Sequence, residues 1–177
     1  MLALIRLFWD ICTFRRGPQD VPYSLFLLAS LLLVKLAIEL VIFYIPNGVG
    51  ARLPLSSVVP YMLADAAISM GVVYLIVWLN GYTARGLQTV TATVGVDIIL
   101  TIVQLPFKYL VSSAGNQADK VAIFYFGTML IFLWELGIYS HVFRHALSTS
   151  IFKAGGYALL CFILSFVIYY QMLPVAG

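Results

Sequence analysis

The chain has 177 residues, of which 63% are hydrophobic and only 10% are charged. Soluble domains are about a quarter charged, so this composition excludes a soluble globular protein and indicates a single membrane domain over residues 1–177. The net charge of +3 is too small and too scattered to suggest nucleic acid as a partner. Cys12 and Cys161 are far apart and form no CxxC motif, so no disulfide framework is expected.

Residues 1–16 form the first predicted element. Arg6 and Asp10 interrupt the apolar run, which is not typical of a signal peptide. Apolar residues recur at helical spacing, namely Ile5, Phe8, Trp9 and Cys12. This pattern predicts a short amphipathic helix in the membrane interface, ended by Gly17-Pro18, with Arg15 and Arg16 among the lipid headgroups. The alternative is that the segment only precedes or extends the first membrane span.

Five hydrophobic segments follow, each close to the roughly 20 residues that cross a bilayer. The expected spans are residues 21–45, 57–79, 89–111, 121–143 and 151–173. Because the connections are short, neighbouring spans are expected to pack antiparallel. The predicted fold is therefore an all-α integral membrane protein, with five transmembrane helices in an up-down bundle. Small residues four apart, such as Ala67 with Gly71 and Thr91 with Gly95, predict close helix contacts.

The distribution of lysine and arginine predicts the orientation. If the N-terminus is cytoplasmic, that side carries Arg6, Arg15, Arg16, Arg85, Arg144 and Lys153. The opposite side then carries Arg52, Lys108 and Lys120. The positive-inside rule therefore favours a cytoplasmic N-terminus and a C-terminus on the other side of the membrane.

The third span carries a polar stripe. Its members are spaced by four, four, three and four residues: Thr93, Asp97, Thr101, Gln104 and Lys108. This is the α-helical repeat, so all five fall on one side of the helix. Lipid does not solvate such a stripe, and it is expected to face protein or water. Lys108, near the end of the span, is also able to extend to the interface.

Charged residues within the spans are the strongest functional candidates, because a charge at mid-bilayer costs at least about 2.5 kcal/mol. Each of the first four spans carries an acid, and only the first also carries a base near mid-depth: Lys35, Glu39, Asp65, Asp97 and Glu135. Depth along alternating spans predicts two clusters, Lys35–Glu39–Asp65 toward the outside and Asp97–Glu135 toward the inside. The second pair is expected to share a proton if adjacent. Both a proton-coupled site and structural hydrogen bonds between helices stay open as interpretations.

The fourth span ends in a histidine pair. His141 and His145 are four residues apart and share a helix face, with Arg144 between them. No further histidine or cysteine completes a metal site, so these residues are interpreted as interfacial. The sequence also lacks GxSxG, Walker-type and HExxH motifs. We therefore expect no enzymatic activity, no cofactor and no metal.

Residues 134–156 carry a family resemblance. Trp134, the run Arg144-His145-Ala146-Leu147 and the small residues Ala154-Gly155-Gly156 resemble bacterial members of the Yip1-domain membrane proteins. The resemblance implies a polytopic protein that acts through membrane partners, and it carries over no catalytic residue. The long cytosolic N-terminal region of the eukaryotic members is missing, which favours the bacterial inner membrane, with a periplasmic C-terminus.

Two hypotheses for function follow. The first is a non-catalytic accessory, assembly or scaffold subunit of a larger membrane complex, with lipid and other membrane proteins or further copies of itself as partners. The alternative is a small oligomeric proton-coupled transporter or channel that uses the intramembrane carboxylates. The first is favoured slightly, because five spans make a thin wall around a pathway.

Overall fold

The structure, a computed structural model, describes residues 2–44, 54–113 and 118–172, with side chains at all of them except 108–113 and 118–124. These residues are mostly helical and contain no strand. The helices are α1 (Leu2–Cys12), α2 (Leu25–Phe43), α3 (Leu55–Leu79), α4 (Gly86–Ser113), α5 (Ala118–Leu147) and α6 (Ile151–Met172). Two short 3-10 helices join them, η1 (Pro18–Asp20) and η3 (Thr83–Arg85).

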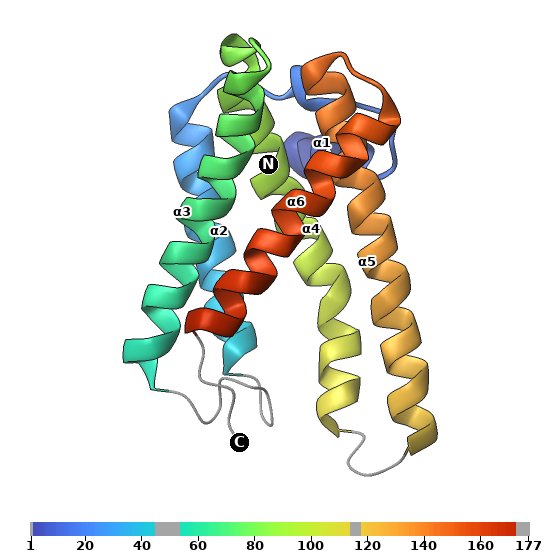
Figure 1. Ribbon diagram of the computed structural model, residues 1–177. Coiled ribbons are helices and arrows are strands. Elements are labelled where there is room, and N and C mark those ends of the chain that lie inside the picture. Colours follow the sequence, from blue (N-terminus) through green and yellow to red (C-terminus); the bar gives the residue numbers. More distant parts are fainter. Residues whose placement is uncertain (1, 45–53, 114–117, 173–177) are drawn as a thin grey trace.

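The helices α2 to α6 are long and apolar enough to cross a membrane, which confirms the five predicted spans. Neighbouring helices run in opposite directions, as expected for an up-down bundle (Figure 1). The first span begins at Leu25 rather than at residue 21. Pro22 lacks a backbone N–H, and the side chain of Ser24 accepts a hydrogen bond from the Leu27 N–H at 3.2 Å, so the helix begins four residues later than predicted.

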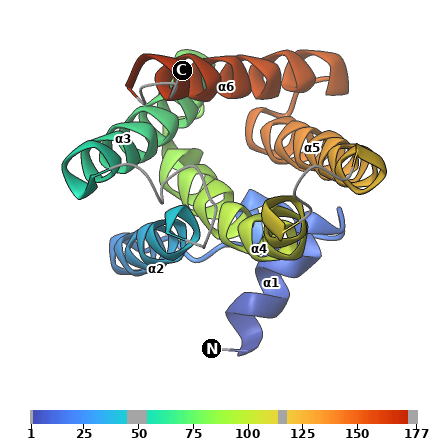
Figure 2. The same cartoon turned by 90° about the horizontal axis from the view of Figure 1, so that it is seen from below.

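Helix α4 lies at the centre of the bundle. Seen along the bundle, the other helices surround it (Figure 2), and it packs against α1, α2, α3 and α5. In its most apolar stretch 50% of the residues are buried, compared with 6% in α2. The polar stripe of the third span is therefore carried by the helix that has the most protein around it.

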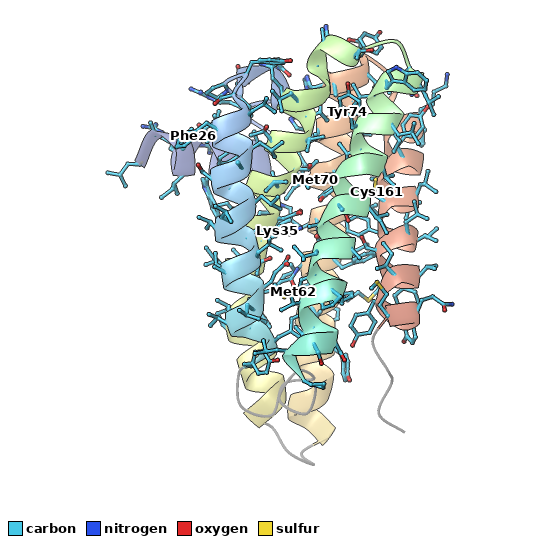
Figure 3. All side chains as sticks on the ribbon, turned by 90° about the vertical axis from the view of Figure 1, so that its left-hand side faces the viewer. Phe26, Lys35, Met62, Met70, Tyr74 and Cys161 are labelled. Atoms are coloured by element: carbon cyan, nitrogen blue, oxygen red, sulfur yellow. The ribbon has the colours of Figure 1, made fainter. Side chains whose placement is uncertain are left out.

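Helix α1 lies across the bundle, near the end that also carries the α3–α4 and α5–α6 connections (Figures 1 and 3). The predicted amphipathic helix is present, but its buried face differs. The buried side chains are Leu7, Phe8, Ile11 and Cys12, which belong to a core shared with α4 and α5. Ile5 and Trp9 are about half-exposed (55% and 45%). The face turns toward α4 because Gly95 has no side chain and the Phe8 ring occupies that space.

The predicted end of this helix at residue 16, before Gly17-Pro18, was wrong by four residues. Phe14 adopts a left-handed conformation with φ of 61°, and the helix ends at Cys12. The N–H groups of Arg15 and Arg16 donate to the Asp10 carbonyl at 2.8 and 3.3 Å. Reversal of the chain thus satisfies a helix-end carbonyl and leads into η1.

Most of the apolar core lies in one half of the bundle, although Val58, Met62 and Ala66 of α3 are also buried toward the other end. Its two clusters use the C-terminal parts of α3 and α5, the N-terminal parts of α4 and α6, and the whole of α1. All of these segments lie toward the α1 end. Figure 3 shows Lys35 at mid-height between α2 and α3, and the polar groups described below extend from this level toward the opposite end.

Cys12 gives a direct test of how α1 is docked. Its side chain is fully buried, and burial, together with the negative charge of Asp97, raises the pKa of the thiol to about 12. Such a thiol is almost entirely protonated at pH 8 and is a poor nucleophile. In a Cys161→Ala variant, N-ethylmaleimide is expected to leave Cys12 unmodified in mild detergent and to label it in SDS. Rapid labelling of the folded protein would contradict the docked position of α1.

Candidate functional site: a polar cavity among the five spans

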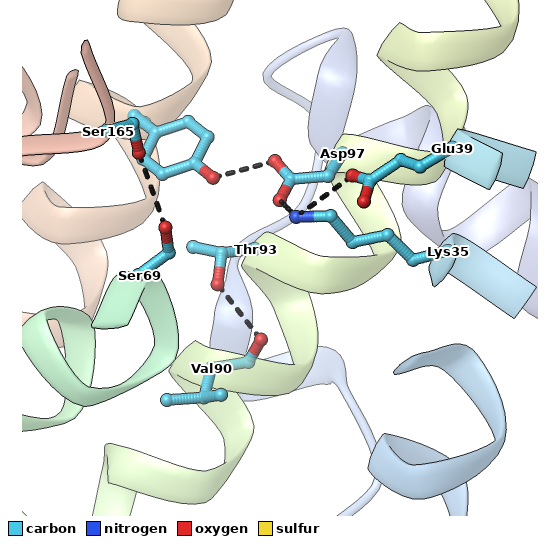
Figure 4. A network of polar contacts seen from close by, with 8 residues as sticks. Lys35, Glu39, Ser69, Val90, Thr93, Asp97 and Ser165 are labelled. Atoms are coloured by element: carbon cyan, nitrogen blue, oxygen red, sulfur yellow. Dashed lines mark hydrogen bonds and ion pairs between the residues drawn. The ribbon is translucent and has the colours of Figure 1, made fainter. Parts of the chain in front are cut away.

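The Lys35 side chain of α2 is directed into the bundle. Lys35 as a whole residue is only 7% exposed, and its ammonium donates to Asp97 Oδ2 on α4 at 2.9 Å. The same ammonium lies 3.6 Å from Glu39 Oε1, one helical turn further along α2. Figure 4 shows the ammonium between the two carboxylates. A lysine in mid-span is thus neutralised by acids from its own helix and from the central one.

Asp97 has a second partner that the sequence analysis did not single out. The Tyr139 hydroxyl of α5 donates to Asp97 Oδ1 at 2.6 Å. Tyr139 is buried, and its ring packs against Phe162 of α6 with centroids 5.3 Å apart. Tyr139 lies one turn after Glu135 on α5, and residues four apart share a helix face. This spacing was the one sequence feature that could have indicated that Tyr139 faces the same side as Glu135. Asp97 is therefore fixed from two sides by a cation and a hydroxyl.

A cavity of about 270 Å³ adjoins this network. Every span contributes to its wall. The polar lining residues are Lys35 and Glu39 of α2, Tyr61, Asp65 and Ser69 of α3, Asp97, Thr101 and Gln104 of α4, Glu135 and Tyr139 of α5, and Ser165 of α6. A smaller cavity of about 40 Å³ shares Lys35 and Asp97 and is lined also by Thr93. The prediction that the α4 stripe faces the protein interior is thus confirmed for Thr93, Asp97, Thr101 and Gln104.

The predicted division into an outer and an inner cluster was wrong. Asp97 meets Lys35, whereas Gln104 Nε2 is the group that approaches Glu135 Oε2, at 3.5 Å. Helix α2 packs directly against α4, and a lysine side chain is long enough to bridge the difference in depth. The charged residues of α2, α3, α4 and α5 therefore line one cavity.

Hydroxyl groups complete the wall on the α3 and α6 side. The Ser69 and Ser165 hydroxyls lie 3.3 Å apart, and both side chains line the cavity together with Asp65. Thr93, by contrast, donates to the Val90 carbonyl of its own helix at 2.9 Å (Figure 4). Its hydroxyl is satisfied locally, so Thr93 contributes less to the network than the stripe alone suggested.

The interfacial candidates hold the α1 end together. Trp9 packs edge-on against Trp134, whose indole N–H donates to the Cys12 carbonyl at 3.0 Å. His141 Nε2 hydrogen-bonds with the Arg16 carbonyl at 2.9 Å. The rings of His141 and His145 lie 4.4 Å apart. The segment after α1 is thereby attached to α5.

The remaining interfacial candidates do not meet at one site. Arg15 and Arg144 are exposed, and Arg16 pairs with Asp10 at 3.6 Å. Lys108 belongs to α4, but its side chain lies outside the described part of the structure. No group of three possible metal-ligating side chains occurs among the described residues.

The hydrogen bond from Tyr139 can be tested by removing one atom. Tyr139→Phe is expected to lower the free energy of unfolding by about 1.5–3 kcal/mol, because a donor to a charged group is lost. Tyr157→Phe is the matched control, since the Tyr157 hydroxyl donates to Asn80 Oδ1 at 3.2 Å at an exposed site. Unfolding in mixed dodecylmaltoside–SDS micelles measures both. Equal losses of unfolding free energy in the two variants would contradict a larger contribution from the hydrogen bond to Asp97.

Comparison with known proteins gives no match: no family model, no curated protein and no solved structure matches this chain.

Proposed function

We propose that the protein is a small proton-coupled transporter and that the cavity is its solute-binding site. The observation that carries the proposal is a buried lysine, Lys35, whose ion pair with Asp97 borders a polar cavity of about 270 Å³. The space has room for several water molecules, at about 30 Å³ each. A polar cavity of this kind among membrane-spanning helices is typical of a solute pathway.

The network provides two positions for a mobile charge. Asp97 and Glu39 both neutralise the same ammonium, at 2.9 and 3.6 Å. A proton or solute that occupies Asp97 competes with Lys35, whose ammonium then moves to Glu39. Binding of the solute and binding of the proton are coupled in this way through one shared cation.

We place the protein in the bacterial inner membrane as a multi-pass protein, with a cytoplasmic N-terminus and a periplasmic C-terminus. The basic side chains of α1, of the connections and of the helix ends support this orientation. Arg6, Arg15, Arg16 and Arg85 belong to α1 or to connections, and Arg144 and Lys153 lie at the ends of α5 and α6, all at the same end of the bundle. In this orientation the cavity lies toward the periplasmic half.

Transport is tested with the purified full chain in liposomes loaded with a pH-sensitive dye. Three non-titrating solutes are offered: tetramethylammonium, erythritol and methanesulfonate. At least one is expected to enter faster than into empty liposomes, with a change in internal pH. Asp97→Asn is expected to abolish this flux, whereas Asp20→Asn in η1 keeps it, because Asn retains an acceptor for the Gly17 N–H. Fluxes equal to those of empty liposomes for all three solutes would contradict transport.

A second candidate function is an accessory, assembly or scaffold subunit. It is supported by the outward faces of α2 and α6, in whose most apolar stretches only 6% and 11% of the residues are buried. Large apolar side chains face outward on α6, among them Ile163, Phe166 and Tyr170. In a membrane, the helices of a partner protein cover such surfaces in place of lipid. The Yip1-like resemblance of residues 134–156 stays a prediction that favours this second function.

A pull-down of the tagged protein from native membranes in mild detergent separates the two functions. A stoichiometric partner, lost on substitution of outward residues of α6 but retained in Asp97→Asn, supports the accessory role. A homo-oligomer or monomer that retains flux in liposomes supports the transporter.

A further inference from the structure

We infer that the solute taken by the cavity is a small primary ammonium ion. This inference rests on the proposed function of the cavity as a solute site and adds the chemical class of the solute. Three features of the cavity wall support it: the ammonium already seated there, the surplus of carboxylates around that ammonium, and the aromatic side chains beside them.

The Lys35 side chain is itself a primary alkylammonium held within the cavity wall. Its position shows that the carboxylates of Asp97 and Glu39 accept such a group, at 2.9 and 3.6 Å, in a place that is almost closed to solvent. An ammonium has three N–H donors, which suits a wall rich in carboxylate and hydroxyl acceptors. The protein thus contains a covalently attached example of the ligand that we propose.

The carboxylates near Lys35 exceed its charge. Asp97, Glu39 and Asp65 all act electrostatically on this one ammonium, and no ion pair among the described side chains includes Asp65. Excess negative charge in a membrane interior requires a bound proton or a bound cation. An ammonium that enters beside Asp65 meets this requirement and releases protons from the cavity. An anionic solute would add to the unfavourable charge.

Aromatic and apolar side chains line the same space. Tyr61, Phe132 and Phe162 border the cavity together with the carboxylates. Aromatic faces attract cations, and the ring surfaces cover the alkyl part of an ammonium. A molecule about the size of a lysine side chain fits the volume of about 270 Å³, which lies below the range of roughly 300–1,000 Å³ typical of drug-sized ligand sites.

The test measures binding of n-butylammonium, which reproduces the lysine stem and head, to the detergent-purified full chain by calorimetry. n-Butanol and butyrate serve as neutral and anionic probes of matched size. Butylammonium is expected to bind about tenfold or more tightly than either. Asp65→Asn is expected to weaken it by a similar factor, whereas Asp20→Asn, outside the cavity, leaves it unchanged. Repeating the titration in buffers of different ionisation enthalpy is expected to show proton release on binding.

A second variant keeps the test decisive if Asp65→Asn folds poorly. Lys35→Ala vacates the ammonium position next to Asp97, so butylammonium is expected to raise its midpoint of unfolding, and n-butanol is not. Equal binding of butanol or butyrate, or binding that does not depend on Asp65, would overturn the ammonium class and leave a cavity that takes other solutes. Butylammonium that binds but enters liposomes containing the protein no faster than empty liposomes would overturn the transport proposal and leave the ammonium-binding cavity standing.

Discussion

Lys35→Met is expected to destabilise the bundle by about 3–5 kcal/mol, because removing one partner of a buried ion pair leaves an uncompensated charge. The Lys35 side chain is 9% exposed and Asp97 is 14% exposed, so solvent screens the pair weakly. Methionine keeps the length and most of the apolar stem, and the change therefore isolates the ammonium. Unfolding in mixed dodecylmaltoside–SDS micelles, followed by circular dichroism, measures the loss.

Lys153→Met is the matched control for this substitution. Lys153 lies in the first turn of α6 at the α1 end, and its side chain is exposed, so its replacement is expected to change stability by no more than about 0.5 kcal/mol. Adding Asp97→Asn to Lys35→Met removes part of the uncompensated charge. The double variant is expected to be less destabilised than the sum of the single variants. Additive losses would show that Lys35 and Asp97 do not interact as an ion pair.

Gly95→Ala is expected to displace α1 from α4 and to lower the free energy of unfolding by about 1–3 kcal/mol, as overpacking of a core does. A methyl group at Gly95 would overlap the ring of Phe8, which is only 3% exposed and has little freedom to move. N-Ethylmaleimide labelling of Cys12 in a Cys161→Ala background reports the displacement. Labelling is expected to become faster in Gly95→Ala than in the parent protein.

Gly71→Ala provides the same chemical change in mid-helix without the overlap. Apart from the glycine, its two chain neighbours and the adjacent backbone of its own helix, no heavy atom lies within 4 Å of the position where its added carbon would stand. This variant is expected to be as stable as the parent protein or more stable by up to about 1 kcal/mol, because alanine favours the helix. Phe8→Leu, which removes the ring, is expected to restore part of the stability of Gly95→Ala. Equal effects of the two glycine substitutions would contradict the packing of α1 on α4.

The contrast between these two glycines shows what the sequence could predict about helix packing. Ala67 with Gly71 and Thr91 with Gly95 share one small-residue pattern, and both predicted close contacts. Thr91 is fully buried and Gly95 receives Phe8, whereas Ala67 and Gly71 are exposed on the outside of α3. Small residues permit a close approach, but the arrangement of the other helices determines whether one occurs.

In the candidate site, too, the sequence predicted features that depend on neighbouring residues but not contacts between separate helices. The spacing of Thr93, Asp97, Thr101 and Gln104 was sufficient to predict an inward face of α4, because helical periodicity depends only on neighbouring residues. Tyr139 was not predicted, since its spacing from Glu135 indicates a shared helix face but not that its hydroxyl reaches Asp97 on another helix.

The sequence by itself determined the number of spans, the interfacial helix and the side of α4 that is polar. Each of these follows from hydrophobic length and periodicity within one segment. The tertiary structure alone decided that Lys35 pairs with Asp97, and that α1 buries Phe8 in place of Trp9. Such pairings depend on the rotation, tilt and relative depth of separate helices, and on the reach of a long side chain, which no single segment of the sequence specifies.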